Sequence, residues 1–420
     1  FPKPDEKIEK CRILVYTCAG GNEDILLEDG TRFFLPIASR QRLLERGLAF
    51  QPDLVIANGD HIYWDQITLL SKSGPLVEAW HDLYRKIGTM DRNIPVLGTD
   101  NEKILKRIVD PQIAHLYGTR LRSTPTYMLT DDHDLFENDE ASDEFISLPP
   151  SQHSLEAARA TQHLYYPEFL PDATRPGSLS GSSASDRISG LSEVFGTIRY
   201  GNLLEALLYD TKRYVSLNGA KAGMVPDAVE KWLINRTVSE ETSQLMHVPS
   251  TPIGWSAGKW GEWYPDILQK DRTLGTNKAK PYWPSGWWQQ HQRILTALSA
   301  QKKRSPLIIN GDLHNFAAGK IMKSGDLDLR HNPVNTVCVG PLGSAGPLFP
   351  STSFRATGAL VPSALELDEH LKPLEKNGFT IIDVSPDKMK FQLFAWRPPE
   401  ELDLIDTMKP ISTFEVSRNS

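Results

Sequence analysis

The sequence predicts an α/β protein in which polar side chains gather at the carboxyl ends of the strands. Three segments far apart in the 420-residue chain share one construction: an apolar run stops, and an aspartate follows with a histidine, a tyrosine or a second aspartate. These segments are Asn58–Tyr63, Thr130–Asp134 and Asn310–His314. In an open α/β sheet, ligands bind outside the carboxyl ends of the strands. The three segments together therefore predict one shared metal site.

The amino-terminal part of the chain predicts a β-α-β unit. Residues 12–17, with four apolar residues at 13–16, are expected to be a buried strand that ends at Cys18. Residues 38–50 carry helical periodicity, and residues 53–58 form the next strand. Because such crossovers join parallel strands with a right-handed connection, we expect these two strands to be parallel.

The rest of the chain continues to alternate between helices and strands. Helices are expected over residues 76–87, 100–109 and 288–300, and around Val229–Leu233. Strands are expected over residues 126–130, 203–209, 307–310 and 334–339, and as a hairpin of residues 379–384 and 390–396. No linker separates two self-sufficient halves, so residues 1–420 are expected to form a single domain.

Two segments have unusual compositions. Residues 171–190 are rich in Ser, Gly, Asp and Pro and are expected to be an exposed loop. Residues 252–290 hold six tryptophans among Gly and Pro. We interpret these tryptophans as core and lid packing rather than as a stacking platform for nucleic acid.

Composition excludes several classes of protein. The formal net charge is -7, whereas a protein that serves as a nucleic-acid scaffold usually carries a basic patch or stripe. No apolar run approaches the ~18 residues expected of a membrane span. The 3 cysteines are too few for a disulfide framework. The chain begins with Phe1 rather than Met, as expected of a mature secreted or periplasmic protein or of a chain that was cut and renumbered.

The residue types at the strand ends suit two metal ions. Asp60 follows its strand directly and can bridge two metals with its two oxygens. A phenolate at Tyr63 favours a ferric ion, by analogy with tyrosinate ligation in haem proteins, and Cys18 can reach the same cleft. Each residue alone is common in cores, caps or surfaces, so the prediction rests on their joint occurrence. Two cations ~3.5–4 Å apart clamp an in-line displacement and lower the pKa of bound water, which attacks as hydroxide. The sequence therefore predicts phosphoester hydrolysis.

The ordered motifs resemble those of the PhoD-like phosphatases, a branch of the calcineurin-like metallophosphoesterases. The family pattern is Ser/Thr-Cys at a strand end, then Gly-Asp-x-x-Tyr, Asp-Asp-His-Glu followed by Asn, and Gly-Asp-x-His. The corresponding segments are Thr17-Cys18, Gly59-Asp60-His61-Ile62-Tyr63, Asp131-Asp132-His133-Asp134 with Asn138, and Gly311-Asp312-Leu313-His314. The resemblance covers most of residues 11–396.

The resemblance implies a fold and a metal centre. The implied fold is a four-layer α/β/β/α sandwich of two mixed sheets. The implied ligands of a ferric ion (Fe3+) are Cys18, Asp60, Tyr63 and His314. The implied second metal is divalent, with Ca2+ favoured over Zn2+, Mn2+ or Mg2+, and its ligands are Asp60, Asp132, Asp312 and Asn138.

The resemblance also implies roles around the metals. His133 stands where the superfamily has its catalytic histidine, and it would protonate the leaving oxygen or steady the phosphoryl group. The strand end at Asp210 is similar to the family's Asp-x-Arg-x-Tyr segment, which implies substrate binding by Asp210, Lys212 and Arg213. Lys212 replaces the family's arginine, and Asp134 replaces its usual glutamate. The aspartate of the family's Trp-Asp-Gly-Tyr segment is replaced around Pro284-Ser285, and the amino-terminal β-domain of many relatives is expected to be absent.

Three functions are compared. The first is metal-dependent hydrolysis of a small or polymeric phosphoester, as a phosphomonoesterase, a phosphodiesterase or both. The second is a metal-stabilised protein without turnover that binds a phosphorylated polymer or lipid through residues 171–190 and 255–290. The third is ester hydrolysis through a nucleophile at Thr17 or Ser123, beside which the sequence offers no base. Intact His133 and both Gly-Asp motifs favour the first.

Overall fold

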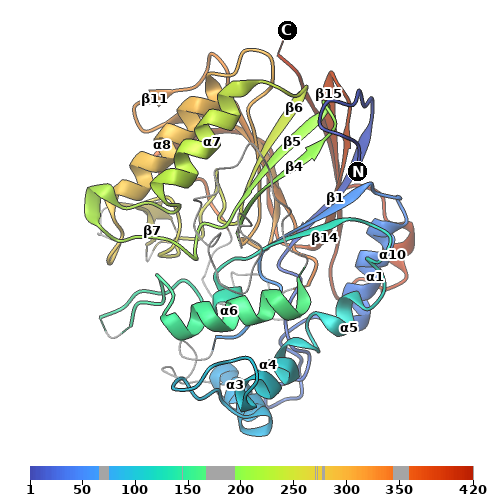
Figure 1. The fold of residues 1–420 in the computed structure, drawn as a ribbon, viewed down its shortest axis with the longest axis vertical. Helices are drawn as coiled ribbons and strands as arrows, with labels where there is room; N and C mark the ends of the chain where they lie inside the picture. The colour runs from blue at the N-terminus through green and yellow to red at the C-terminus, as the bar shows by residue number, and fades with distance from the viewer. Residues whose placement is uncertain are drawn as a thin grey trace.

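The computed structural model describes residues 1–65, 75–143, 145–166, 194–269, 271, 273–276, 280–343 and 359–419. Two large β-sheets lie face to face in these residues, and helices cover the outer face of each sheet (Figure 1). The expected four-layer α/β/β/α arrangement of two mixed sheets is therefore confirmed. The loop predicted over 171–190 lies outside the described residues.

The first sheet has the strand order β16-β15-β14-β1-β2-β3. Strands β1, β2 and β3 are parallel to one another, and the remaining pairs are antiparallel. The bounds are β1 (Cys11–Thr17), β2 (Leu54–Asn58), β3 (Thr126–Leu129), β14 (Asn377–Val384), β15 (Lys388–Trp396) and β16 (Ser412–Ser417). The predicted β-α-β unit is confirmed, with helix α1 (Ile37–Leu48) between β1 and β2. The predicted carboxyl-terminal hairpin is confirmed as β14 and β15.

The second sheet has the order β11-β10-β12-β9-β6-β5-β4, with β13 paired to β10. Its central strands β5, β6, β9 and β12 are parallel. The bounds are β4 (Phe195–Tyr200), β5 (Leu204–Tyr209), β6 (Gln244–Pro249), β9 (Leu307–Asn310), β10 (Phe316–Ser324), β11 (Leu327–Asp328), β12 (Val334–Val339) and β13 (Leu365–Leu374). A separate small hairpin pairs β7 (Ile267–Leu268) with β8 (Leu274–Gly275).

Strand β1 shows why the parallel strands are continuous apolar runs in the sequence. Successive side chains of a strand point to opposite faces of its sheet. Ile13 and Val15 belong to the core between the two sheets, whereas Leu14 and Tyr16 belong to the core between the first sheet and its helices. Both faces of the strand are buried, so the alternation between apolar and polar residues disappears.

The helices pack in two groups (Figure 1). The first group contributes apolar side chains to the core over the first sheet. It comprises α1, α3 (Pro75–Ile87), α4 (Asp100–Val109), α5 (Ala114–Tyr117), α6 (Gln152–Tyr165) and α10 (Leu404–Thr407). The second group, α7 (Asp227–Ser239) and α8 (Ser285–Ser299), covers the second sheet. All of the predicted helices are present, with ends shifted by a few residues.

The tryptophans of residues 252–290 are core residues. Trp260, Trp263 and Trp287 are buried in one core cluster, and Trp283 and Trp288 are partly buried against it. Trp255 is buried in a second cluster. The interpretation as core packing is confirmed, and a role in a lid stays a prediction.

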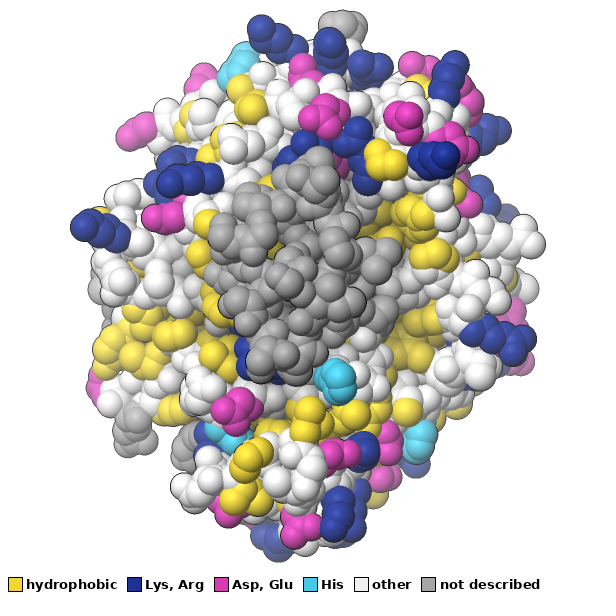
Figure 2. Space-filling view, viewed as in Figure 1, with side chains coloured by type: hydrophobic (Ala, Val, Ile, Leu, Met, Phe, Trp, Pro, Cys, Tyr) yellow, Lys and Arg dark blue, Asp and Glu magenta, His cyan; other side chains and the backbone are white. Residues whose placement is uncertain are grey.

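Charged side chains of both signs lie on the described surface. Figure 2 shows acidic and basic side chains interspersed on one face rather than segregated into a basic stripe. Among the described residues, every helix is too short or too polar to cross a membrane.

Candidate metal centre and active site

The site lies where strand ends from both sheets meet. Cys18 follows β1, Asp60 follows β2 and Asp132 follows β3, all in the first sheet. Asp312 follows β9 in the second sheet. The hydroxyl of Thr17 links the two sheets there, because it donates to the Asn58 carbonyl at 2.6 Å and accepts from the Asp312 amide at 3.3 Å. Facing sheets thus bring residues that are nearly 300 positions apart into one cluster.

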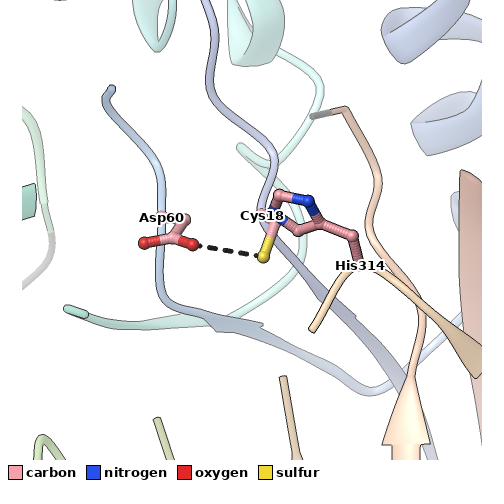
Figure 3. A group of neighbouring side chains, drawn as sticks. All are labelled: Cys18, Asp60 and His314. Atoms are coloured by element: carbon pink, nitrogen blue, oxygen red, sulfur yellow. Dashed lines mark hydrogen bonds between the residues drawn. The ribbon is translucent and has the colours of Figure 1, made fainter. Parts of the chain in front are cut away.

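One group of side chains matches the predicted ferric site. Ligand atoms of Cys18, Asp60 and His314 all lie within 4.8 Å of one another (Figure 3). The Cys18 thiol donates to Asp60 Oδ2 at 3.3 Å. The Tyr63 hydroxyl lies 3.4 Å from Asp60 Oδ2 and 3.0 Å from His314 Nε2. All four side chains that the resemblance implies as ligands are therefore adjacent.

A second group shares Asp60 with the first. Carboxylate oxygens of Asp60, Asp131, Asp132 and Asp312 lie within 4.8 Å of one another. Asp131 is an addition to the predicted ligands of the second metal, which included its neighbour Asp132 but not Asp131 itself. Asn138 is half-buried on the wall of an adjoining pocket, and its Oδ1 accepts the Asp139 amide at 2.9 Å.

The backbone at these positions is held in a left-handed conformation. The φ angles are 47° at Cys18, 55° at Asp60, 64° at Asp312 and 54° at His314. This region costs a non-glycine residue roughly 1–2 kcal/mol, although Asp and His adopt it more often than most. Such strain persists where the surroundings over-determine it, and it clusters at functional sites. The turns therefore aim the four side chains inward at a cost to stability.

Two motif glycines allow the strand ends to approach. A Cβ at Gly59 would lie 2.7 Å from Cβ of Asp131, and one at Gly311 would lie 2.2 Å from Oγ1 of Thr17. Neither side chain can retreat without breaking the cluster. Glycine is required in both Gly-Asp motifs because a side chain would push the ligand-bearing turns apart.

Asp134 organises the turn after β2. Its carboxylate accepts the backbone amides of Asp60 at 2.8 Å, His61 at 2.9 Å, Ile62 at 3.1 Å and Asp131 at 3.0 Å. Carboxylates that accept several backbone N–H groups form strong, charge-assisted hydrogen bonds. Asp134 is thus buried and holds the turn that carries Asp60 in place. This residue, which replaces the family's usual glutamate, therefore has a structural role here.

We expect Asp134→Ala to destabilise the fold by about 3 kcal/mol or more. The substitution would leave several buried amides without an acceptor, and each such amide costs about 1–3 kcal/mol. Equilibrium unfolding in urea measures the change, with exposed Asp326→Ala as the control. A loss below about 1 kcal/mol would show that water or another group replaces the carboxylate.

The acidic group, which is Asp60, Asp131, Asp132 and Asp312, has buried oxygens and two carboxyls with raised pKa values. Burial first, and then repulsion from Asp132, raises the pKa of Asp60 well above its usual value. Burial likewise raises the pKa of Asp131. Buried carboxylate oxygens without a hydrogen-bond donor are Asp60 Oδ1, Asp131 Oδ1 and Oδ2, Asp132 Oδ1 and Asp312 Oδ2. Buried charges are normally paired or bound to metals, so these residues fit the binding of metal cations.

His133 has a partner that the sequence did not reveal. Its Nδ1 lies 2.8 Å from Oδ1 of Asp65, and its ring packs on Tyr63 with centroids 4.2 Å apart. One ring nitrogen of His133 lies within 4.8 Å of oxygens of Asp60 and Asp132. Burial lowers the pKa of His133, but the carboxylates of Asp65, Asp132 and Asp60 outweigh it and raise the pKa to about 10. Asp65 thus orients the ring and favours its protonated form.

Two lysines enter the acidic group, and one of them was not anticipated. Lys212 is buried, with Nζ 3.0 Å from Asp139 Oδ2 and 3.1 Å from the Gly261 carbonyl. Lys259 was not singled out from the sequence, yet its Nζ lies 3.0 Å from Asp312 Oδ1 and 3.2 Å from Asp139 Oδ1. Asp139 was missed too, although it follows Asn138 directly. No local pattern marks Lys259, because it comes from a loop among the tryptophans.

The other predicted substrate contacts are engaged within the protein. Asp210 is buried, and its Oδ1 accepts the backbone amides of Lys212 at 2.7 Å and Arg213 at 2.9 Å. The hydroxyl of Thr130 donates to its other oxygen. Arg213 is also buried and donates to Oε1 of Gln162 at 2.8 Å. Asp210 caps the turn after β5, so substrate binding by Asp210 and Arg213 stays a prediction that these contacts do not support.

The nucleophile alternative gains no support. The hydroxyl of Thr17 is buried and joins the strand ends, as described above. Ser123 is exposed in the segment before β3 and has no hydrogen bond to a histidine among the described contacts.

Comparison with known proteins identifies the family. The profile of the PhoD-like phosphatases matches residues 40–393. The chain belongs to the PhoD-like phosphatase family. A solved structure described as PhoD covers 100% of this chain and 72% of its own, with 14% identity and a TM-score of 0.58. This likeness supports the shared fold. A comparison with curated proteins finds no match.

Two other solved structures are more distant. A purple acid phosphatase, PPD1 from yellow lupin (Lupinus luteus) seeds, has 11% identity and a TM-score of 0.49, and covers 98% of this chain and 55% of its own. A dimetal phosphatase from Danio rerio has 10% identity and a TM-score of 0.44, and covers 98% of this chain and 99% of its own.

Membership in the PhoD-like phosphatase family confirms the prediction of a phosphoric ester hydrolase. It also implies dependence on metal ions, for which the cluster of Asp60 and its neighbours is the candidate site.

Proposed function

We propose that this PhoD-like phosphatase hydrolyses phosphate esters at a dinuclear metal site centred on Asp60. The observation that carries the proposal is the sharing of Asp60 between two ligand groups, one with Cys18 and His314 and one with Asp132 and Asp312. A carboxylate between two groups can bridge two cations, and phosphate esters suit a two-cation site.

The proposed ligand sets follow from the two groups. The first cation, proposed to be Fe3+, would be held by Cys18, Asp60, Tyr63 and His314. The second, proposed to be divalent and preferably Ca2+, would be held by Asp60, Asp131, Asp132 and Asp312. Asn138 is a further proposed ligand, because its Oδ1 and Oδ2 of Asp132 accept the same Asp139 amide. When bound, such cations activate water and neutralise the charge of the phosphoryl group.

His133 supplies the proton for the leaving oxygen in this proposal. Asp65 holds Nδ1, so Nε2 is the ring nitrogen left for the substrate. The neighbouring carboxylates favour the protonated ring, which is the form that a general acid requires. The Asp65–His133 pair therefore presents a proton at the edge of the acidic group.

The group esterified to the phosphate is proposed to enter an adjoining pocket. This pocket has a volume of about 640 Å³, and its walls include Asp139, Lys259, Trp260 and Lys280. Lys259 lines this pocket and pairs with Asp132 and Asp312, so the pocket lies beside the acidic group. A pocket of this size is within the range that small-molecule ligands fill.

Metal analysis of the purified protein, combined with rates on matched phosphomonoesters and phosphodiesters, tests the proposal. We expect the purified protein to contain bound metal and to hydrolyse these esters. A chelator should abolish the hydrolysis, and added metal should restore it. Full activity in metal-free protein would overturn it.

We expect the purified protein to absorb visible light through charge transfer from Tyr63 or Cys18 to Fe3+. Tyr63→Phe should shift or bleach this band, because it removes the phenolate, whereas Tyr282→Phe at an exposed position should not. Absorption spectra with iron analysis make the measurement. A colourless, iron-free and fully active protein would contradict the ferric assignment but not a two-metal site.

A further inference from the structure

We propose that Lys259 is an internal cation that weakens binding of the second metal ion, so that the protein holds one metal tightly and a second only loosely. The inference rests on the proposed function. Lys259 Nζ lies 3.0 Å from Asp312 Oδ1, 3.4 Å from Asp132 Oδ2 and 3.2 Å from Asp139 Oδ1. Two of these carboxylates belong to the proposed second metal site, and the third is adjacent to it.

The contacts are selective for one of the two groups. Asp132 and Asp312 each give one oxygen to Lys259 and keep a second, buried oxygen without a hydrogen-bond donor. The three ion pairs described above join Lys259 to Asp132 and Asp312 of the second group and to Asp139 beside it. The ammonium therefore neutralises part of the charge of the second site.

Burial makes this charge effective. The Lys259 side chain is 9% exposed, and that of its partner Asp312 is 2% exposed. Solvent screens charges poorly in such a place, so an ammonium in contact with the ligand oxygens repels an incoming divalent cation strongly. Lys212 pairs with the other oxygen of Asp139. The negative charge of Asp139 is therefore divided between two lysines, which leaves more of the positive charge of Lys259 for Asp132 and Asp312.

Calcium binding to Lys259→Met tests the inference. Methionine is unbranched and only one heavy atom shorter than lysine, and it carries no charge. The as-purified proteins are dialysed against metal-free buffer, their retained metal is counted by elemental analysis, and Ca2+ is then titrated by calorimetry. Lys259→Arg retains the charge, and exposed Lys302→Met is the matched control for a loss of charge elsewhere.

We expect wild type, Lys259→Arg and Lys302→Met to retain one metal equivalent and to bind Ca2+ weakly. Lys259→Met should bind Ca2+ at least tenfold more tightly. Lys259→Met leaves buried carboxylates unpaired, which lowers the stability of the metal-free variant, so thermal unfolding is measured as well. Ca2+ should raise the melting temperature of Lys259→Met more than it raises that of wild type. This second readout holds even where the metal-free variant is too unstable for calorimetry.

Each other outcome overturns the inference. Wild type that retains two equivalents through dialysis, or a Ca2+ affinity in Lys259→Met within twofold of wild type, shows that Lys259 does not oppose the second metal. Tightening in Lys259→Arg equal to that in Lys259→Met shows that space, not charge, is responsible. Absence of any metal binding in all variants overturns the proposed function itself, whereas the first three outcomes leave it standing.

Discussion

Asp60→Asn is expected to abolish hydrolysis and to lower the content of both metals. Asp60 is the residue that both ligand groups share, and asparagine cannot offer two anionic oxygens. Replacing even outer-shell partners of a metal typically costs about 10–100-fold in affinity or activity, so losing the bridge should exceed about 100-fold. Initial rates and elemental analysis of the purified variant measure the two effects.

Stability distinguishes this loss from misfolding. The carboxyl of Asp60 is buried beside other carboxylates, which raise its pKa. Asparagine removes that repulsion, so the metal-free variant should unfold at a temperature no lower than that of metal-free wild type. Asp326→Asn in an exposed turn is the control and should retain wild-type rate and metal. Wild-type rate and metal stoichiometry in Asp60→Asn would mean that the strand-end cluster is not the active site.

His133→Ala is expected to lower kcat by about 10²–10⁴-fold for an alkyl phosphate, the usual contribution of a general acid. The loss should be smaller for a nitrophenyl phosphate, because that leaving group needs little protonation. Metal content should not change, since His133 is a proton donor in this proposal and not a ligand. Rates on both substrates, with metal analysis, make the test.

Two further variants locate the effect. Exposed His163→Ala on α6 should match wild type with both substrates. Asp65→Asn should lose less rate than His133→Ala but show the same dependence on the leaving group, because Asp65 acts by orienting and charging the ring. Loss of metal in His133→Ala would make His133 a ligand. Equal losses with both substrates would assign it to positioning rather than protonation, and no loss would remove it from the mechanism.

The proposed ligand residues were predictable because their signals are local. A buried parallel strand is a short apolar run in the sequence, and the turn after it can bear a functional side chain. Cys18 follows its strand directly, and Asp60 and Asp312 each follow theirs after one glycine. The glycines before Asp60 and Asp312 are local signals too, since each marks a turn where backbones approach closely.

Other elements of the fold carried no such signal. Strand β13 alternates between half-buried and exposed residues over Leu365–Leu374 and holds several charges, because it pairs with β10 at the edge of the sheet and exposes one of its own faces. Strand β6 is buried but contains Gln244 and His247. Gln244 Nε2 donates to the Ser385 carbonyl at 3.0 Å, and His247 Nε2 lies 2.8 Å from the Thr237 hydroxyl. Burial of polar residues in a strand depends on those partners, which lie elsewhere in the chain.

The sequence by itself determined the family, the α/β class and the strand-end residues Cys18, Asp60 and Asp312, since each depends on a few consecutive residues. Only the tertiary structure decided which side chains act on those residues. Asp134 follows β3 and anchors the turn after the neighbouring strand β2, Asp65 pairs with His133, and Lys259 reaches the acidic group from a loop about 50 residues before Asp312. An ion pair or hydrogen bond between residues distant in the sequence exists only once the chain has folded, because its energy depends on separation in space and not on separation along the chain.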